Sequence, residues 1–418
     1  MPKEYRKAQQ FDTRTLVPAF CKVTTDDDRA LTNDAEVAAS QRHRNRFDRM
    51  EWAGAFGDLG TLIPYVVAYI GVMGLDPLGV LTGFGVCMVA SGVWYRTPFP
   101  VQPMKALGAV AATQAAQTAT ITPAAVYAAA LVTGIIWLLL GLTGATRWVV
   151  NLISRPVIVG IVLGLGLGFM LEGAKMMAVG WLLSSLGLLV ALLLLSSRRL
   201  PAMFVLLIGG AVVAVIRDPT LLDALARINF QPRLPSFAIA GISWSDLVLG
   251  LVFLALPQVP LTLGNAIIAI TEENNRLFPH RPVSERSVSI STGLMNVFAA
   301  AIGGVPMCHG AGGMAGHVRF GARTGGALII LGGILILLGL FFSGSVDAIF
   351  RVVPREILGV ILFLTGAQLA LGSCDFSKDK GERFTTIITA GLAMWNIGLA
   401  FAVGLVAFHL IKRDWIRL

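Results

Sequence analysis

Long apolar runs follow one another from residue 51 to the end of the chain, separated by short polar gaps. A helix of about 20 apolar residues can cross a bilayer. The runs lie at 52–73, 77–95, 99–119, 123–144, 156–178, 180–196 and 202–216, and then at 244–271, 287–303, 306–318, 325–343, 354–372, 383–396 and 397–411. We therefore predict an all-α polytopic membrane protein with about fourteen transmembrane segments.

Two of these runs, 99–119 and 306–318, are too short or too rich in proline and glycine to cross as regular helices. They occupy matching places, third in each set of seven runs. Interrupted segments at matching places in two halves point to the binding site of a transporter with inverted repeats. Seven segments in each half is an odd number, so the second half must be inverted relative to the first.

The same pattern divides the chain into four parts. Residues 1–49 are polar and of mixed charge, and we predict a disordered cytoplasmic tail. Residues 50–217 form the first transmembrane repeat and 218–243 a polar linker. Residues 244–418 form the second, inverted repeat with a short cytoplasmic C-terminus.

Composition supports a membrane protein. Hydrophobic residues make up 55% of the chain and charged residues 14%, whereas a soluble domain carries roughly 25% charge. The net charge of +9 comes from basic residues in the gaps between apolar runs. They gather on one side of the predicted topology, which places both termini in the cytoplasm and argues against nucleic acid as a partner.

Enzyme, metal and cofactor functions find no support in the sequence. The four cysteines are scattered and no pair has metal-ligand spacing. Neither a nucleotide-binding motif nor a nucleophile–base arrangement is visible. We therefore expect no catalytic residues, no bound metal and no cofactor.

The first interrupted segment contains the stretch PFPVQPMKALGA, residues 98–109. Proline suits the first turn of a helix, so the prolines predict an extended entry into a half-helix that begins near Gln102 and Pro103. The free N–H groups at such a helix start attract an anion. Gln102 would add an amide donor and Lys105 a positive charge.

The second interrupted segment, 303–326, repeats this arrangement with a proline, a polar residue and a glycine-rich helix start. Glycines let an oxyanion approach the backbone closely, and a histidine could act as a donor. Two half-helices that face each other by their N-termini would concentrate positive potential at one point. The predicted site residues here are Cys308, His309, Gly310, Gly312 and Gly313.

The stretches PVQPMKA and PMCHGAGGMAGHVRFGARTGG closely resemble the two signature motifs of the molybdate transporter family, a distant branch of the sulfate permease superfamily. The resemblance covers residues 51 to about 411. It implies a 7+7 inverted-repeat fold with core and gate domains, molybdate as substrate and a homodimer. Val305 and the pair His317-Val318 depart from the usual motif beside the predicted site, which leaves fine selectivity open.

Several polar residues allow two interpretations. Gln102 could cap its helix, and Lys105 could pair with Asp58 rather than bind substrate. Asp58 itself would repel an anion, so it is either a structural partner or a proton-coupling carboxylate. His309 could be a structural histidine or a donor to the anion.

A further polar face lies on the segment that opens the second half. Gln258, Thr262 and Asn265 are roughly one helical turn apart. They either join helices by hydrogen bonds or form a wall of the site.

We predict a secondary transporter of molybdate that works by alternating access in the plasma membrane or an internal membrane. One alternative is a sulfate or other small-anion transporter of the same fold. An uncoupled anion channel and a non-transporting anion sensor also remain open.

Overall fold

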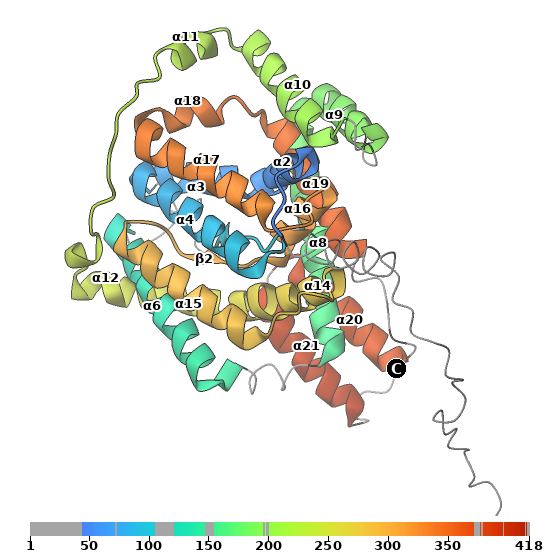
Figure 1. Cartoon of the computed structure of the whole chain (residues 1–418). Helices are drawn as coiled ribbons and strands as arrows, with labels where there is room; N and C mark the ends of the chain where they lie inside the picture. Colours follow the sequence, from blue (N-terminus) through green and yellow to red (C-terminus); the bar gives the residue numbers. More distant parts are fainter. Residues whose placement is uncertain are drawn as a thin grey trace, which may run out of the picture. The chain divides into compact units, whose positions relative to one another are not determined.

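Capping residues in the sequence explain where several helices begin. The computed structural model describes residues 44–71, 73–104, 121–146, 154–194, 197, 200–371, 377, 379–395, 397–413 and 415 (Figure 1). Asp76 accepts a hydrogen bond from the N–H of Leu78, and Thr122 accepts one from the N–H of Ala125. These bonds satisfy N–H groups that the first turn of a helix leaves without partners. Residues Asn45–Leu418 form one unit, which contains both ranges predicted as repeats.

The first half of this unit is helical apart from one two-residue strand. Its elements are α2 (Arg49–Ala55), η1 (Phe56–Asp58), α3 (Leu59–Gly71), α4 (Pro77–Tyr95), β1 (Gln102–Pro103), α6 (Pro123–Thr143), α8 (Arg155–Met177), η3 (Ala178–Gly180), α9 (Trp181–Leu194), α10 (Ala202–Arg217) and α11 (Thr220–Ala226). The hydroxyl of Ser184 donates to the carbonyl of Met177 at 2.7 Å. Residues seven apart in a straight helix are about 10 Å apart along its axis, so the chain turns back at η3.

The second half has the same character. Its elements are η4 (Ile239–Gly241), α12 (Trp244–Leu249), η5 (Gly250–Ala255), α13 (Leu256–Leu261), η6 (Thr262–Ala269), α14 (Ile270–Leu277), α15 (Glu285–Ala301), β2 (Met307–Cys308), α16 (Ala311–Arg319), α17 (Gly326–Phe342), η7 (Ser343–Ser345), α18 (Val346–Phe350), α19 (Arg355–Leu371), α20 (Lys380–Ala393) and α21 (Ile397–Lys412). The segments η5 and η6 are π-helical. Pro257 and Pro260 both lie in α13, between η5 and η6, and proline removes N–H groups from the α-helical pattern.

Helices of the two halves pack against each other in pairs. α4 packs on α17, α6 on α15 and α8 on α19, and the first two pairs lie side by side in Figure 1. A Cβ atom at Gly85 would lie 2.6 Å from the carbonyl oxygen of Gly332, and one at Gly173 would lie 2.7 Å from that of Gly359. Only glycine fits at such distances, so these residues bring the backbones together, as small residues do in membrane helices.

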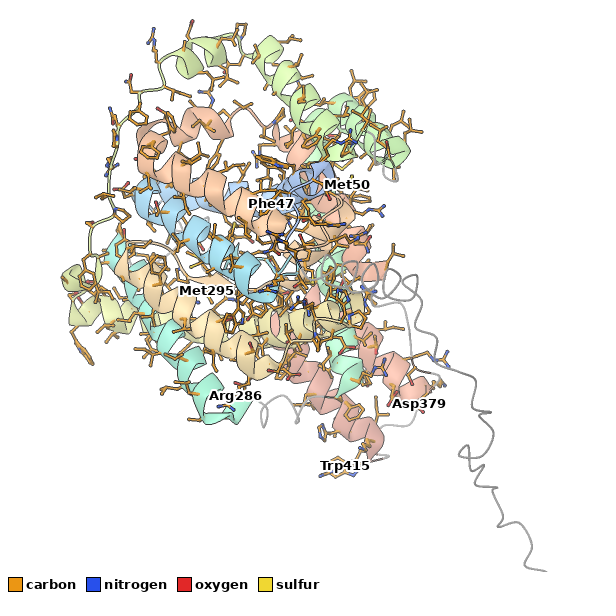
Figure 2. The ribbon with its side chains drawn as sticks, in the orientation of Figure 1. Phe47, Met50, Arg286, Met295, Asp379 and Trp415 are labelled. Carbon is orange, nitrogen blue, oxygen red and sulfur yellow. The ribbon has the colours of Figure 1, made fainter. Side chains whose placement is uncertain are left out.

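The outer surface of the described helices is apolar, with tryptophans near helix ends. Within the described residues, four helices are long and apolar enough to cross a membrane, or up to six if two bent pairs each form one span. The exposed tryptophans are Trp52, Trp94, Trp181, Trp244, Trp395 and Trp415. Each is within three residues of a helix end, and Trp415 lies beyond the end of α21 in Figure 2. Tryptophan is enriched at membrane interfaces, so this placement fits helices that cross a bilayer.

Several predicted segments agree with helices of the structure to within two residues. The ranges 77–95, 123–144, 325–343 and 354–372 correspond to α4, α6, α17 and α19. The prediction of two helices rather than one in 383–411 is confirmed, because α20 ends at Ala393 and α21 begins at Ile397. Residues 105–120 lie outside the described residues. The half-helix predicted there, and the count of fourteen segments, therefore stay predictions.

The linker between the halves follows the ends of three helices. The N–H groups of Gln231 and Arg233 donate to carbonyls at the end of α17, and Ala238 donates to Ala301 at the end of α15. The guanidinium of Arg233 pairs with the carboxylate of Asp76 at 2.6 Å. This linker thus joins the start of α4 to α15 and α17. The short helix α11 lies within the predicted linker range 218–243.

Candidate functional site

The two glycine- and proline-rich motifs meet through a pair of short strands. β1 and β2 are antiparallel, with Gln102 opposite Cys308 and Pro103 opposite Met307. The N–H of Met104 donates to the carbonyl of Pro306 at 3.1 Å. All four strand residues are buried. The structure therefore brings Gln102, Pro103 and Cys308 together, while Lys105 lies outside the described residues.

The helix that follows β2 begins in the protein interior. α16 has nine residues, a length of about 14 Å, and Gly310 stands at its N-cap without a side-chain hydrogen bond. The N–H of Gly313 donates to the carbonyl of Gly310. The N–H groups of Ala311 and Gly312 have no acceptor among the described residues. Free N–H groups and the positive end of the helix dipole make this a place where an anion can bind.

Gln102 lies against this helix start and is bound to a carboxylate. Its Nε2 atom is 2.7 Å and 2.8 Å from the two carboxylate oxygens of Asp58 and 2.9 Å from the hydroxyl of Thr61. The hydroxyl of Thr61 also donates to Asp58. Both Gln102 and Asp58 are buried. The amide donor predicted for the substrate is therefore engaged by a carboxylate in this structure.

The glycines of α16 leave no room for side chains at this point. A Cβ atom at Gly313 would lie 2.8 Å from an Asp58 carboxylate oxygen and 2.9 Å from Nε2 of Gln102. A Cβ atom at Gly310 would collide with Oε1 of Gln102 and lie 3.3 Å from Nδ2 of Asn265. The backbone of Gly310 and Gly313 thus contacts polar side chains directly. This explains the glycine-rich sequence after β2.

Two buried oxygen atoms near Gly310 lack partners. Oε1 of Gln102 and Oδ1 of Asn265 have no hydrogen-bond partner among the described residues. A buried polar atom left unsatisfied costs about 1–3 kcal/mol. The bonds from Nε2 of Gln102 to Asp58 determine which end of that amide is the oxygen. Because both atoms are acceptors, a water or another hydrogen-bond donor would satisfy them, whereas an oxyanion would not.

One of the three polar residues predicted on the helix that opens the second half lies at the start of α16. Asn265 lies in η6 beside Gly310. Nε2 of Gln258 donates to the hydroxyl of Thr262 at 3.1 Å. All three residues are buried. Wide π-helical turns such as η6 occur often at functional sites, and here the turn carries Asn265 to the start of α16.

His309 is held on both sides by protein atoms. Its Nδ1 atom is 2.7 Å from the carbonyl oxygen of Pro100, and its Nε2 atom is 2.8 Å from the hydroxyl of Ser291. The rings of Tyr95 and Phe99 pack around it. Because a carbonyl only accepts, Nδ1 carries a proton. A role for His309 as a donor to substrate would require one of these bonds to break.

Two residues that the sequence did not single out hold the motifs in place. Nδ2 of Asn296 on α15 donates to the carbonyl of Met307 at 2.7 Å, and its Oδ1 accepts from the Met307 N–H at 2.9 Å. On α2, the carboxylate of Glu51 accepts from the N–H groups of Arg323 and Thr324, both at 2.9 Å. The signal in the sequence was a polar residue inside the run 287–303 for Asn296 and an acidic residue directly before the run 52–73 for Glu51.

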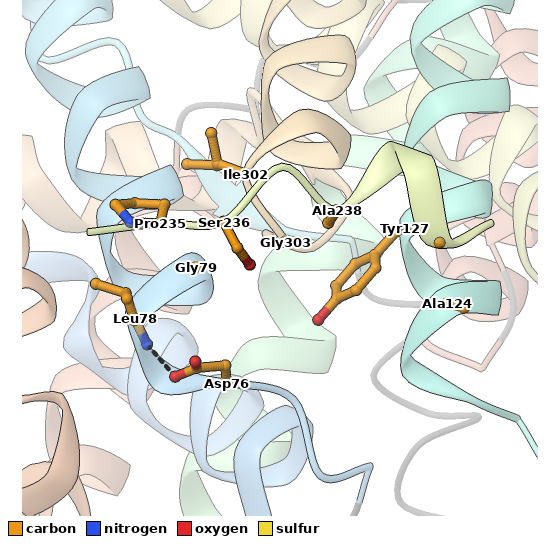
Figure 3. Close-up of a pocket in the computed structure, with 11 residues that line it drawn as sticks. Asp76, Leu78, Gly79, Ala124, Tyr127, Pro235, Ser236, Ala238, Ile302 and Gly303 are labelled. Atoms are coloured by element: carbon orange, nitrogen blue, oxygen red, sulfur yellow. Dashed lines mark hydrogen bonds between the residues drawn. The ribbon is translucent and has the colours of Figure 1, made fainter. Parts of the chain in front are cut away.

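A separate cavity of about 220 Å³ lies between the starts of α4 and α6, the linker and the end of α15. Figure 3 shows Asp76, Ser236 and Tyr127 around it. The predicted site residues are not among those that line it. Within the described residues, no group of His, Cys, Asp and Glu could hold a metal ion.

Comparisons with known proteins agree on the class of this chain. The family described as "Molybdate transporter of MFS superfamily" matches residues 50–169 and 250–369. Molybdate transporter 2 of Arabidopsis thaliana is 34% identical over 413 residues, which cover 87% of each chain. Molybdate transporter 1 of the same plant is 32% identical over 405 residues, with 86% of each chain covered.

The structural comparison gives the fold. The murine anion transporter Slc26a9 in its inward-facing state aligns with a TM-score of 0.55 at 12% identity, covering 97% of this chain and 74% of that one. This likeness establishes a shared helical membrane-protein fold. Together with the match over both halves of the sequence, it leads to one conclusion: the chain belongs to the molybdate transporter family.

Proposed function

We propose that the protein is a secondary transporter that binds molybdate at the start of α16 and moves it by alternating access. The observation that carries this proposal is the buried start of α16, whose N–H groups at Ala311 and Gly312 are free among the described residues. Gln102 and Asn265 stand beside it. Backbone N–H groups and neutral amides suit an oxyanion, because they stabilise negative charge without forming a permanent ion pair.

We infer that the carboxylate of Asp58 becomes protonated when an anion binds. Its carboxylate lies beside Gly313 and accepts a hydrogen bond from Nε2 of Gln102. A carboxylate and an oxyanion in one low-dielectric site repel each other. Protonation of Asp58 would remove this repulsion and release the Gln102 amide. We therefore infer that one proton enters with each anion, which makes Asp58 the coupling residue.

Three features support two inverted repeats, at 50–217 and 244–418. The packing pairs α4–α17, α6–α15 and α8–α19 each take one helix from either half. If α4 is exchanged with α15 and α6 with α17, the set of pairs stays the same. The family match also falls on two stretches, 50–169 and 250–369. A two-fold relation between the halves produces this pattern.

The exposed tryptophans support a topology with both termini in the cytoplasm. In that topology Trp52, Trp94 and Trp415 lie at the inner interface, and Trp181, Trp244 and Trp395 at the outer one. The basic gaps of the sequence lie on the inner side as well. The homodimer implied by the family remains part of the proposal, and its mass in detergent tests it.

Uptake of labelled molybdate into proteoliposomes tests the proposal. Wild-type protein should accumulate molybdate, and acidification outside the vesicles should increase uptake. Gln102→Ala should lose most of the uptake, whereas the matched control Gln231→Ala, in the linker, should retain it. Normal uptake by Gln102→Ala would contradict the site assignment.

The same preparation separates the alternatives. Equal affinities for sulfate and molybdate would indicate a general anion transporter. Currents far above the turnover of a carrier would indicate a channel. Tight molybdate binding with uptake at background would indicate a sensor.

A further inference from the structure

The start of α16 is enclosed from three directions. Gly313 faces Asp58 and Gln102, and Gly310 faces Gln102 and Asn265. Gly312, between them, faces a different element. A Cβ atom there would collide with the ring of Phe169 on α8, whose Cζ atom would lie 2.8 Å away. Phe169 therefore covers the helix start from the side that the polar residues leave open.

The position of Phe169 is set by close packing of α8 on α19. A Cβ atom at Gly366 would lie 2.8 Å from the Cβ atom of Phe169 and 2.7 Å from the N atom of Met170. The absence of a side chain at Gly366 lets the backbone of α8 come near enough for the ring to reach Gly312. The ring is 8% exposed. Phe169 is thus a buried residue rather than a surface residue.

One side of the ring lies nearest the helix start. The three ring atoms nearest Gly312 are Cε2, Cζ and Cδ2, which lie along one side of the ring. The edge of an aromatic ring carries partial positive charge, while its faces are negative. An edge that faces an anion site therefore adds weak attraction, whereas a face would add repulsion. The ring also excludes water, which strengthens the bonds from N–H groups to an anion.

We propose that Phe169 forms the apolar wall of the oxyanion site and sets the size of the anion that fits. This inference rests on the proposed function. Because Phe169 lies on α8 and the other walls lie on β1, η1, η6 and α16, movement of α8 relative to α16 opens this wall. Molybdate is a larger tetrahedral dianion than sulfate, so the size of the side chain at position 169 should change the ratio of their affinities.

Binding and uptake of molybdate and sulfate by three variants at Phe169 test this inference. Phe169→Ala removes the wall, so molybdate affinity should fall at least tenfold and the preference over sulfate should shrink. Phe169→Trp reduces the space, so molybdate binding should fall more than sulfate binding. Phe169→Leu keeps much of the volume but loses the ring edge, so its molybdate affinity should lie between those of wild type and Phe169→Ala.

The matched control is Phe363→Ala. Phe363 lies on α19 and packs in a separate apolar cluster with residues such as Ile357 and Val360. The Phe363→Ala variant should have affinities for molybdate and sulfate within twofold of those of the wild type. If Phe169→Ala does not fold, the molybdate and sulfate affinities of Phe169→Leu and Phe169→Trp provide the test.

Two results would overturn different claims. Variants at Phe169 that fold and keep wild-type affinities and the wild-type ratio of molybdate to sulfate would refute the role of this residue. Wild-type protein that binds neither anion would instead refute the proposed function. Wild-type molybdate binding combined with a changed ratio in Phe169→Trp supports both.

Discussion

Glu51 and Asp58 are two buried carboxylates near the start of the first transmembrane run. Each lies at the start of a helix in the second half, but the groups that donate hydrogen bonds to them differ. Glu51 accepts hydrogen bonds from the backbone N–H groups of Arg323, Thr324 and Ala327. It thereby caps the start of α17. Asp58 lies beside Gly313 at the start of α16, but Gln102 and Thr61 hold it by side chains.

The difference shows which helix start is closed and which can accept a ligand. Backbone N–H groups cannot turn away, so the Glu51 contacts form a permanent part of the fold. Side chains can exchange partners, so Gln102 can leave Asp58 for an anion. The N–H groups of Ala311 and Gly312 remain available among the described residues. We therefore propose that Glu51 contributes to stability and that the Asp58 region binds the ligand.

Glu51→Ala should have the largest effect. It leaves the N–H groups of Arg323, Thr324 and Ala327 without this acceptor, and breaking a buried charged network costs roughly 3–5 kcal/mol. The measurement is the melting temperature in detergent, with Glu172→Ala as control because Glu172 forms an exposed pair with Lys175. An unchanged melting temperature for Glu51→Ala would contradict the stabilising role that distinguishes Glu51 from Asp58.

Gly313→Ala should weaken molybdate binding while the protein still folds. The new Cβ atom would lie 2.8 Å from the Asp58 carboxylate and 2.9 Å from Nε2 of Gln102. We expect an affinity loss of at least about tenfold, or about 1.4 kcal/mol, by titration. Gly333→Ala on α17 is the matched control, since its Cβ atom meets nothing within 4 Å. Equal losses in both variants would exclude a local effect.

Asp58→Asn should change the pH profile of uptake. If the proposed coupling holds, wild-type protein binds the anion with Asp58 protonated, so uptake should fall as pH rises. An amide is neutral at every pH, so the variant should show a flat profile, with uptake that exceeds wild type on the alkaline side. Uptake measured between about pH 5 and 8 by both proteins decides this. If uptake by Asp58→Asn keeps the pH dependence of the wild type, another residue carries the coupling proton.

Thr61→Val should have the smallest effect. It removes a hydroxyl that contacts Asp58 and Nε2 of Gln102 and keeps the shape of the side chain. Loss of one such bond is worth about 1 kcal/mol, or about fivefold in affinity. Titration with molybdate measures it, and Thr61→Ser should restore wild-type affinity. Failure of the serine variant to do so would mean that the hydroxyl bonds do not hold this site.

The sequence predicted the long helices well because they are determined locally. Asp76 and Thr122 stand before α4 and α6 as caps, and polar gaps separate the apolar runs. The meeting of the two motifs could also be proposed, since both carry a proline and then small residues.

The contacts within the site could not be predicted in the same way. The bond between Gln102 and Asp58 joins residues 44 positions apart, and Phe169 reaches Gly312 only because Gly366 lets α8 approach α19. Such contacts depend on how helices from both halves pack. The π-helical turn that places Asn265 has no local pattern beyond the two prolines near it.

The strand pair β1–β2 has a consequence for biogenesis. Its two strands are separated by roughly 200 residues, which a ribosome needs about 10–40 s to translate. During that interval the nascent first half sits in the membrane without α15, α17 and α19, the helices that cover its glycine-lined faces. These faces therefore lack their packing partners until the second half emerges. A polypeptide severed in the linker should regain its site only when both pieces are synthesised in the same cell.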